Sequence, residues 1–184
     1  MQIKDFVKVF DVEIPDKILE LIKENQGNMH QGITGNGEIL DIRNCLEHYL
    51  PPQAYEHFSD SEKIVYNFFD KLNTKLIDRY LELFPEATDS IVKIHAGIHI
   101  LKYDKDGKYV QHIDDFGRRA IRRLSVSVIL NDDYKGGNFS FFNGKYTPTL
   151  TKNQAIVFPS SWMFPHQITP VTNGERWAVI SWFI

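Results

Sequence analysis

The spacing of apolar residues changes character about halfway along the chain. In the first half, apolar residues recur at helical spacing. Ile18, Leu21 and Ile22 would share one face of a helix that begins near Pro15 and ends at Gly27. A longer helix is expected over residues 59–84, with capping serines at its start and Pro85 after its end. Residues 1–90 are therefore predicted to form a helical support region.

After about residue 91, short β-rich runs alternate with turn signals such as Asn143-Gly144. We expect eight strands, and eight short strands are typical of a jelly roll, or double-stranded β-helix. The runs are IHAGIHILKY, KYVQHID, IRRLSVSVILN, GNFSFF, KYTPTL, QAIVFP, PHQITPV and RWAVISWFI. The fold class predicted for residues 1–184 is mainly β with supporting α, in one domain whose catalytic core is residues 91–184.

The run LSVSVIL predicts how the roll is oriented. Alternate side chains of a strand point to opposite faces. Leu124, Val126, Val128 and Leu130 would form an apolar face against the helices, while Ser125, Ser127 and Ile129 would face the inside of the roll.

Composition and charge limit the binding partners and the cellular compartment that we expect. The chain has 184 residues, 42% of them hydrophobic, and a net charge of −3. This balance gives no reason to expect nucleic-acid or membrane partners. The single cysteine, Cys45, fits a reducing cytoplasm, and neither a signal peptide nor a membrane span is predicted.

The most informative polar residues are His112 and Asp114, two positions apart in a strand-like run. Residues i and i+2 point to the same side of a strand. His166, at the start of a distant strand, could supply a third ligand. Two histidines and a carboxylate form the facial triad of non-haem Fe(II) sites, which leaves three coordination positions open. The alternative is a surface histidine beside an acidic turn, since His-x-Asp also occurs by chance.

The other histidines are weaker candidates for metal binding. His30, His48 and His57 have no partner at ligand spacing, which favours surface or local hydrogen-bonding roles. His95 and His99 lie four apart in a β-like run, where that spacing does not converge on a metal.

Arg176 lies ten residues after His166. If the two residues began neighbouring strands of a hairpin, both could face one cavity, and the guanidinium could hold a dicarboxylate. The alternative is an exposed arginine at a strand end.

Several fragments together resemble the 2-oxoglutarate/Fe(II)-dependent dioxygenases, in particular their prolyl 4-hydroxylase-like branch. The resemblance covers about residues 90–184. The fragments are YDKDGKYVQHIDD, RRLSVSVILNDDYKGGNFSF, AIVFP and PHQITPVTNGERWAVISWF.

The resemblance implies that His112, Asp114 and His166 bind Fe(II) and that Arg176 binds the distal carboxylate of 2-oxoglutarate. Other pocket residues would be Tyr103, Phe139 and Trp182, although aromatic side chains at these positions could also simply fill a β core. Ile129 replaces a tyrosine that many relatives carry, so Ser125 or Ser127 would supply a hydroxyl instead.

The implied reaction uses Fe(II), 2-oxoglutarate and O₂, with ascorbate open as a reductant, and hydroxylates an unactivated C–H bond while releasing succinate and CO₂. Peptidyl proline is the favoured substrate. The alternatives are a free amino acid or other small metabolite and, from another class, a non-catalytic cupin-like binding module.

The segment DFGRRAIRR follows Asp114 directly. It is interpreted either as a solvated loop or as a flap over the mouth of the roll, with Gly117 giving freedom at its base. In the second case Arg118, Arg119 and Arg122 would grip a peptide substrate. Arg122 aligns best with the arginine that approaches substrate in the peptide-hydroxylating relatives.

Overall fold

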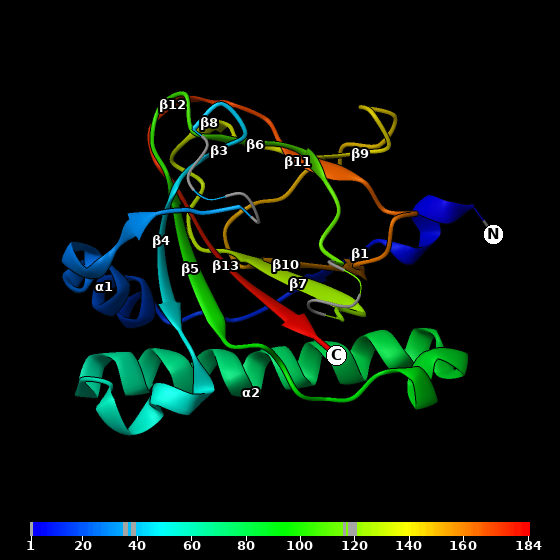
Figure 1. Cartoon of the computed structure of the whole chain (residues 1–184), viewed down its shortest axis with the longest axis horizontal. Coiled ribbons are helices and arrows are strands. Elements are labelled where there is room, and N and C mark those ends of the chain that lie inside the picture. Colours follow the sequence, from blue (N-terminus) through cyan, green and yellow to red (C-terminus); the bar gives the residue numbers. More distant parts are fainter. Residues whose placement is uncertain (1, 35–36, 38–39, 116, 118–120) are drawn as a thin grey trace.

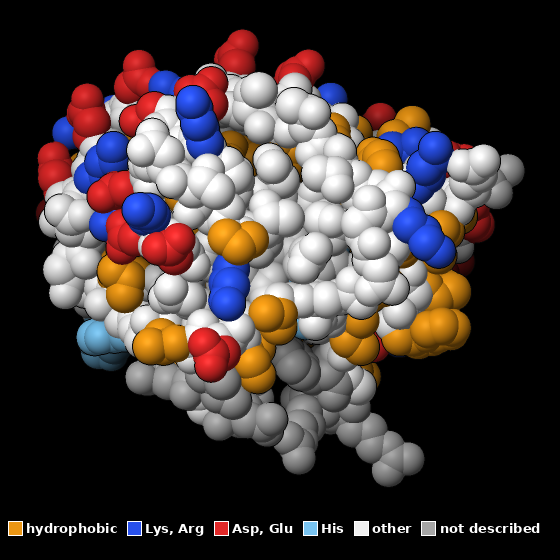
Figure 2. Space-filling model, turned by 90° about the horizontal axis from the view of Figure 1, so that it is seen from above, with side chains coloured by type: hydrophobic (Ala, Val, Ile, Leu, Met, Phe, Trp, Pro, Cys, Tyr) orange, Lys and Arg blue, Asp and Glu red, His pale blue; other side chains and the backbone are white. Residues whose placement is uncertain are grey.

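The computed structural model describes residues 2–34, 37, 40–115, 117 and 121–184. Two β-sheets face each other to form a flattened roll, and a long helix lies across the outer face of the larger sheet (Figure 1). Seen from the side of the smaller sheet, acidic and basic side chains are interspersed along one edge (Figure 2).

Two α-helices form where the apolar spacing predicts them: α1 Asp16–Glu24 and α2 Asp60–Leu83. Ser59 caps α2, because its hydroxyl accepts from the Glu62 backbone N–H while the Glu62 carboxylate accepts from the Ser59 N–H. The 3₁₀ turns are η1 Ile3–Phe6, η2 Gln26–Asn28, η3 Pro52–His57 and η4 Pro85–Ser90. Within the described residues, no helix is both long and apolar enough to cross a membrane.

The larger sheet has seven strands in the order β1-β10-β7-β13-β5-β4-β2. Its strands are β1 Lys8–Asp11, β2 His30–Gln31, β4 Leu46–Leu50, β5 Ile98–Tyr103, β7 Leu124–Ile129, β10 Gln154–Pro159 and β13 Arg176–Phe183. All of its strand pairs are antiparallel. β13 lies at the centre and is buried along its whole length.

The smaller sheet has four strands in the order β3-β6-β11-β9. They are β3 Arg43–Asn44, β6 Lys108–His112, β9 Phe139–Phe141 and β11 His166–Ile168. A separate pair joins β8 Lys135–Gly136 to β12 Val171–Asn173.

The predicted faces of β7 are confirmed. Leu124, Val126, Val128 and Leu130 pack in one cluster with residues of α2, including Phe69 and Leu76. Ile129 belongs to a second cluster between the two sheets, with residues such as Phe139 and Ile180. The outer face of the larger sheet therefore binds the helix, and the inner face is left for the site.

Three expectations need correction. Residues 145–150 form no strand beyond a single bridge from Tyr146 to Phe141, since Pro148 interrupts the run. The first helix ends at Glu24, before Gly27, and continues as a 3₁₀ turn. The first half is also not purely helical, because β1, β2, β3 and β4 add strands to both sheets.

The helix-to-sheet contact predicts a difference between two adjacent phenylalanines. Phe69 is fully buried and Phe68 partly buried. Phe69→Ala should lower the free energy of unfolding by about 3–5 kcal/mol, because it leaves a cavity under the sheet. Urea unfolding would measure this loss, with Phe68→Ala as the matched control and a smaller loss expected. Equal losses from the two variants would contradict this account of the core.

Candidate metal and cosubstrate site

A cavity of about 1060 Å³ lies between the two sheets. Strands β5, β7 and β13 line it from the larger sheet, and β6, β9 and β11 line it from the smaller sheet. The eight residues predicted for the metal and cosubstrate site all line this cavity: Tyr103, His112, Asp114, Ser127, Phe139, His166, Arg176 and Trp182. Arg122, the predicted substrate-binding residue, lines it as well.

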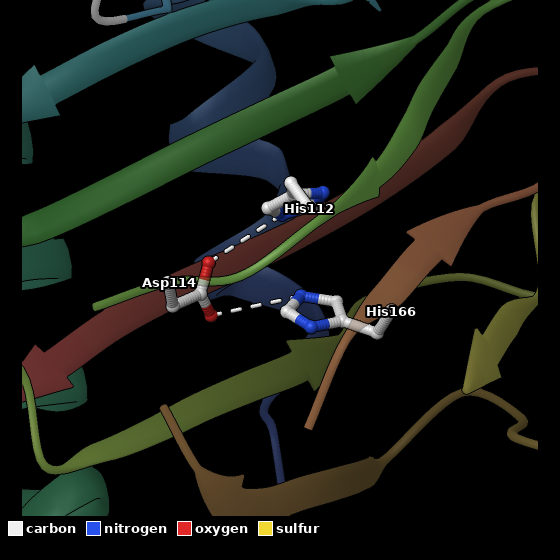
Figure 3. A group of neighbouring side chains, drawn as sticks. All are labelled: His112, Asp114 and His166. Carbon is white, nitrogen blue, oxygen red and sulfur yellow. Dashed lines mark ion pairs between the residues drawn. The ribbon is translucent and has the colours of Figure 1, made fainter. Parts of the chain in front are cut away.

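Strand pairing brings His112 and His166 together. The two residues are direct partners in the antiparallel register of β6 and β11. Asp114 follows the end of β6, and its carboxylate lies between the two imidazole rings (Figure 3). Its oxygens are 3.4 Å from Nε2 of His112 and 3.6 Å from Nε2 of His166. One ligand atom from each residue lies within 4.8 Å of the others.

Two backbone carbonyls decide which nitrogen of each ring faces Asp114. Nδ1 of His112 lies 2.8 Å from the carbonyl of Val110, and Nδ1 of His166 lies 3.1 Å from that of Phe164. Because a carbonyl accepts, each Nδ1 donates, and Nε2 of each ring is the nitrogen that faces the carboxylate. Three lone-pair donors therefore converge on one point, which is the arrangement that a divalent cation stabilises.

The local electrostatics keep Asp114 and His166 in their metal-binding forms. Burial raises the pKa of Asp114, but His166, His112 and the Ser125 hydroxyl outweigh it and hold that pKa far below its usual range. Burial lowers the pKa of His166 to about 4, against the opposing effect of Asp114. At neutral pH the carboxylate is thus ionised and this imidazole neutral, as metal coordination requires.

Ser125 orients Asp114. Its hydroxyl donates to Oδ2 of Asp114 at 2.7 Å and lies 2.8 Å from Oγ of Ser160. The inner-face position predicted for Ser125 agrees with this contact, but its hydroxyl binds Asp114, whereas the sequence suggested it as a possible ligand of the cosubstrate. With Ser125 committed to Asp114, Ser127 is the hydroxyl of that strand face that lines the cavity.

Arg176 is a buried cation at the other end of the cavity. It is 1% exposed, and no described carboxylate lies within ion-pair distance of it. Within the part of the chain that the structure describes, its Nε has no hydrogen-bond partner. Its guanidinium carbon lies 5.2 Å from the ring centre of Tyr103 and 5.6 Å from that of Phe139. Because an unpaired buried charge is costly, this position favours an anionic ligand.

Arg176 and His166 are not hairpin neighbours, contrary to the expectation. β13 pairs with β5 and β7 in the larger sheet, whereas β11 pairs with β6 and β9 in the smaller sheet. The two residues reach one cavity because they face each other across the roll.

The remaining wall residues are mostly buried. Tyr103 lies directly opposite Arg176 in the β5–β13 register, and burial raises the pKa of its hydroxyl, which therefore stays protonated. Phe139 lies near His166, with ring centres 6.0 Å apart. Ile129 is buried in the core between the sheets. No contact in the structure shows a replacement for the tyrosine that many relatives carry there.

Arg122 turns into the cavity wall. Its guanidinium carbon lies 3.6 Å from the ring centre of Trp182, and Nη1 donates to the backbone carbonyl of Asp114 at 3.2 Å. It is thus connected to the metal-binding loop and to the aromatic wall at once. Arg118 and Arg119 lie outside the described residues.

The first half of the chain supplies side chains to this cavity, which the sequence did not predict. Arg43, Glu47 and Tyr49 line it, and so does His99, which had been set aside as a metal ligand. His48, at an adjacent position, pairs with Glu62 at 3.0 Å, which is a local role as expected. The short strands around residues 43–50 carried a weak pattern, so their position could not be read from spacing.

A model of the 2OG-Fe(II) oxygenase superfamily matches residues 98–184. This range contains His112, Asp114, His166 and Arg176. Residues 98–184 belong to the 2OG-Fe(II) oxygenase superfamily.

Curated relatives of this oxygenase segment include hydroxylases. The PKHD-type hydroxylase of Paracoccus denitrificans is 30% identical over 92 residues, which are 44% of this chain and 40% of that protein. Prolyl 3-hydroxylase 1 of Rattus norvegicus is 27% identical over 147 residues, 71% of this chain and 20% of that protein. The matches thus span less than half the length of these relatives.

Solved structures confirm the predicted roll. A Pseudomonas putida prolyl-4-hydroxylase superposes with a TM-score of 0.68 at 18% identity, covering 97% of this chain and 92% of that one. A prolyl hydroxylase from Trichoplax adhaerens, in complex with a hypoxia inducible factor peptide fragment, gives 0.70 at 14% identity, covering 98% and 84%. At such identities the likeness concerns the fold. Together with the superfamily match, it agrees with the resemblance to the prolyl 4-hydroxylase-like branch.

The oxygenase triad predicts metal binding that depends on each ligand. His112→Ala and His166→Ala should each weaken Fe(II) binding by more than about 100-fold, because removing a ligand costs more than removing a supporting hydrogen bond. Anaerobic calorimetric titration would measure the affinity. His57→Ala, at an exposed position in η3, is the control and should bind like the wild type. Unchanged affinity in either triad variant would remove that residue from the site.

Proposed function

We propose that this protein is an Fe(II)- and 2-oxoglutarate-dependent hydroxylase that acts on peptidyl proline. One observation carries the reaction class. The cavity combines three converging metal ligands with a buried guanidinium on the opposite wall, that of Arg176, which has no ion-pair partner among the described residues. A metal-binding module has no need of such a cation, whereas a dicarboxylate cosubstrate that chelates the metal does.

The residues of the chain have separate tasks in this reaction. His112, Asp114 and His166 would hold Fe(II) on one face, and Ser125 would keep Asp114 oriented. When bound, Fe(II) would supply O₂ activation coupled to oxidative decarboxylation of 2-oxoglutarate, so that one oxygen atom enters succinate, the other converts a substrate C–H into C–OH, and CO₂ is released. The protein positions these groups and excludes water.

Arg176 would bind the distal carboxylate of 2-oxoglutarate. Tyr103, opposite it in the strand register, and Ser127 would add hydroxyl groups on the same inner face. Phe139 and Trp182 would close the sides of the pocket. The charge of Arg176 is pre-organised, since the surrounding strands hold it before the anion arrives.

The choice of peptidyl proline rests on the relatives and on the size of the cavity. The curated relatives include a prolyl 3-hydroxylase, and one structural neighbour holds a peptide. A cavity of about 1060 Å³ exceeds what 2-oxoglutarate alone would fill. A free amino acid or other small metabolite is the alternative that the test must separate.

A substrate screen tests the function. The protein would be incubated with Fe(II), 2-oxoglutarate and O₂, with and without ascorbate, against proline-containing peptides and free amino acids. Succinate formation that requires Fe(II) and O₂ would establish the oxygenase. A gain of one oxygen in peptides would support the proposed substrate class, and a gain in free amino acids alone would contradict it.

The cosubstrate assignment makes a prediction about Arg176. Arg176→Ala should raise the KM for 2-oxoglutarate steeply, because losing one partner of a buried charge pair costs about 2–5 kcal/mol. Arg176→Lys should recover part of the loss, since a point charge replaces a two-pronged donor. Succinate assays over a 2-oxoglutarate titration would measure the change, and Fe(II) affinity serves as the control. An unchanged KM in Arg176→Ala would overturn the assignment.

The position of Arg122 predicts an effect on substrate binding. Arg122→Ala should raise the KM for peptide, while succinate formation in the absence of peptide continues. Its neighbour Arg123 is exposed and provides the matched control, Arg123→Ala. Because Arg122 packs into the wall, added salt should screen its contribution less than that of an exposed charge. Equal peptide KM values for the wild type and Arg122→Ala would show that the side chain does not contact substrate.

A further inference from the structure

A second polar cluster lies in the cavity wall, away from the metal ligands. Glu47 is on β4 and His99 on β5, and both line the cavity. The register pairs Tyr49 with His99 and Glu47 with Leu101, so these side chains share the inner face of the larger sheet. Ile180 of β13 lies opposite His99 on the other side.

Contacts on two sides hold the His99 ring. It stacks on Tyr49, with ring centres 4.1 Å apart, and meets the Trp182 ring edge-on at 4.7 Å. The hydroxyl of Tyr49 donates to the carbonyl of Ala96 at 2.7 Å, which fixes Tyr49 in turn. The imidazole is thus pre-organised.

Glu47 determines which nitrogen of His99 carries the proton. Its Oε1 lies 2.5 Å from Nδ1 of His99, and its Oε2 lies 3.2 Å from Nη2 of Arg43. Burial raises the pKa of Glu47, but His99 and Arg43 together hold it below its usual value, and burial lowers the pKa of His99. An ionised carboxylate accepts, so Nδ1 donates and Nε2 retains its lone pair.

Nε2 of His99 makes no hydrogen bond to any residue that the structure describes, although the ring lines the cavity. Because Nε2 is a hydrogen-bond acceptor held rigidly in a mostly buried wall, a ligand with an N–H or O–H group would satisfy it by donating a hydrogen bond. A carboxylate ligand would be repelled, because both it and Nε2 carry lone pairs and neither has a proton to donate.

The neighbouring charges favour a neutral donor over an ammonium group. Each carboxylate described on the cavity wall already has a partner: Glu47 has Arg43 and His99, Glu62 has His48, and Asp114 belongs to the metal triad. An ammonium would find no free carboxylate among them. A peptide amide N–H carries no charge and meets the requirement.

His99 also lies at the correct end of the cavity for substrate. Its ring contacts Trp182, and the guanidinium carbon of Arg122 lies 3.6 Å from the centre of the same Trp182 ring, while Arg122 donates to the carbonyl of Asp114. Arg176, the cosubstrate residue, lies opposite Tyr103, four positions along β5 from His99. The cluster is therefore linked through Trp182 and Arg122 to the loop that carries Asp114, and it lies four residues along β5 from the cosubstrate end.

We propose that Glu47 and His99 form a substrate-recognition pair, in which Nε2 of His99 accepts a hydrogen bond from a backbone amide N–H of the peptide. The proposal rests on the proposed function and specifies how the peptide is recognised. Proline itself has no N–H, so the donor belongs to a residue near the proline that is hydroxylated. His99 contacts substrate, and Glu47 is a positioning residue that keeps the proton on Nδ1.

The test replaces each amide N–H in turn. A proline peptide that the wild type hydroxylates would be compared with ester versions, in which oxygen replaces one backbone N–H. At one position the ester should raise the wild-type KM about three- to tenfold, the range of one neutral hydrogen bond. His99→Phe keeps a ring between Tyr49 and Trp182 but has no acceptor. In this variant the amide and ester peptides should have equal KM values.

Three further variants separate recognition from structural damage. His99→Gln restores an acceptor and should recover part of the preference for the amide. Glu47→Gln still accepts from Nδ1 and should retain it, while Glu47→Met should weaken it. His57→Phe, at an exposed position, is the matched control. Succinate formation without peptide and the KM for 2-oxoglutarate should stay unchanged in this His57→Phe control.

The outcomes are distinguishable. If the wild type hydroxylates peptides but discriminates amide from ester no better than His99→Phe at every position, the recognition pair is overturned and the proposed function stands. If the wild type makes succinate but hydroxylates no peptide, the proposed function fails, and this inference fails with it.

Discussion

Two imidazole nitrogens and a carboxylate present their lone pairs to the same small volume, and much of the roll serves to hold them there. Left alone, such groups repel one another, so each is restrained from behind. The carbonyls of Val110 and Phe164 accept hydrogen bonds from the two Nδ1–H groups, and Ser125 donates to Asp114. Burial then keeps His166 neutral and removes the water that would otherwise separate the three groups. A bound divalent cation would relieve the repulsion among these three groups.

The inner face of the larger sheet carries two groups of polar residues at different ends of the cavity. At one end, Arg176 and Tyr103 are register partners, and this is where we propose that the anionic cosubstrate binds. Toward the other end of the same strands, Trp182 contacts both His99 and Arg122. The smaller sheet supplies the two histidines between these ends. Since strands are stiff and their side chains alternate strictly, the register fixes the distance between the cosubstrate end and the substrate end.

The outer face explains how these strands are held. Leu124, Val126 and Val128 pack against α2, whose apolar stripe includes Phe69 and Leu76. A one-residue slip in β7 would bury Ser125 and Ser127 against the helix and turn the valines into the cavity. Packing on one face therefore protects the chemistry on the other, and α2 contributes to the site without touching it.

The two helices, the two faces of β7 and the grouping of His112, Asp114 and His166 could be predicted from sequence, because each depends on local periodicity or on residue types with few alternative uses. The family resemblance strengthened the choice of His166 as third ligand and the assignment of Arg176 to the distal carboxylate of 2-oxoglutarate. The short strands β1, β2, β3 and β4 were missed, since each is stabilised by pairing with a distant partner and carries little pattern of its own. The strand predicted at residues 145–150 does not form, for the converse reason. Its residues favour β structure, but apart from the Tyr146–Phe141 bridge they have no neighbouring strand to pair with.

The sequence by itself determined which way each side chain points from its own strand and what chemistry it brings. Tertiary structure alone decided which strands face each other. It placed Arg176 across the roll from His166 instead of beside it, committed Ser125 to Asp114, and brought Glu47 from the first half against His99. The physical reason is that side-chain direction follows from local backbone geometry, whereas the partner of a strand depends on packing between segments far apart in the chain.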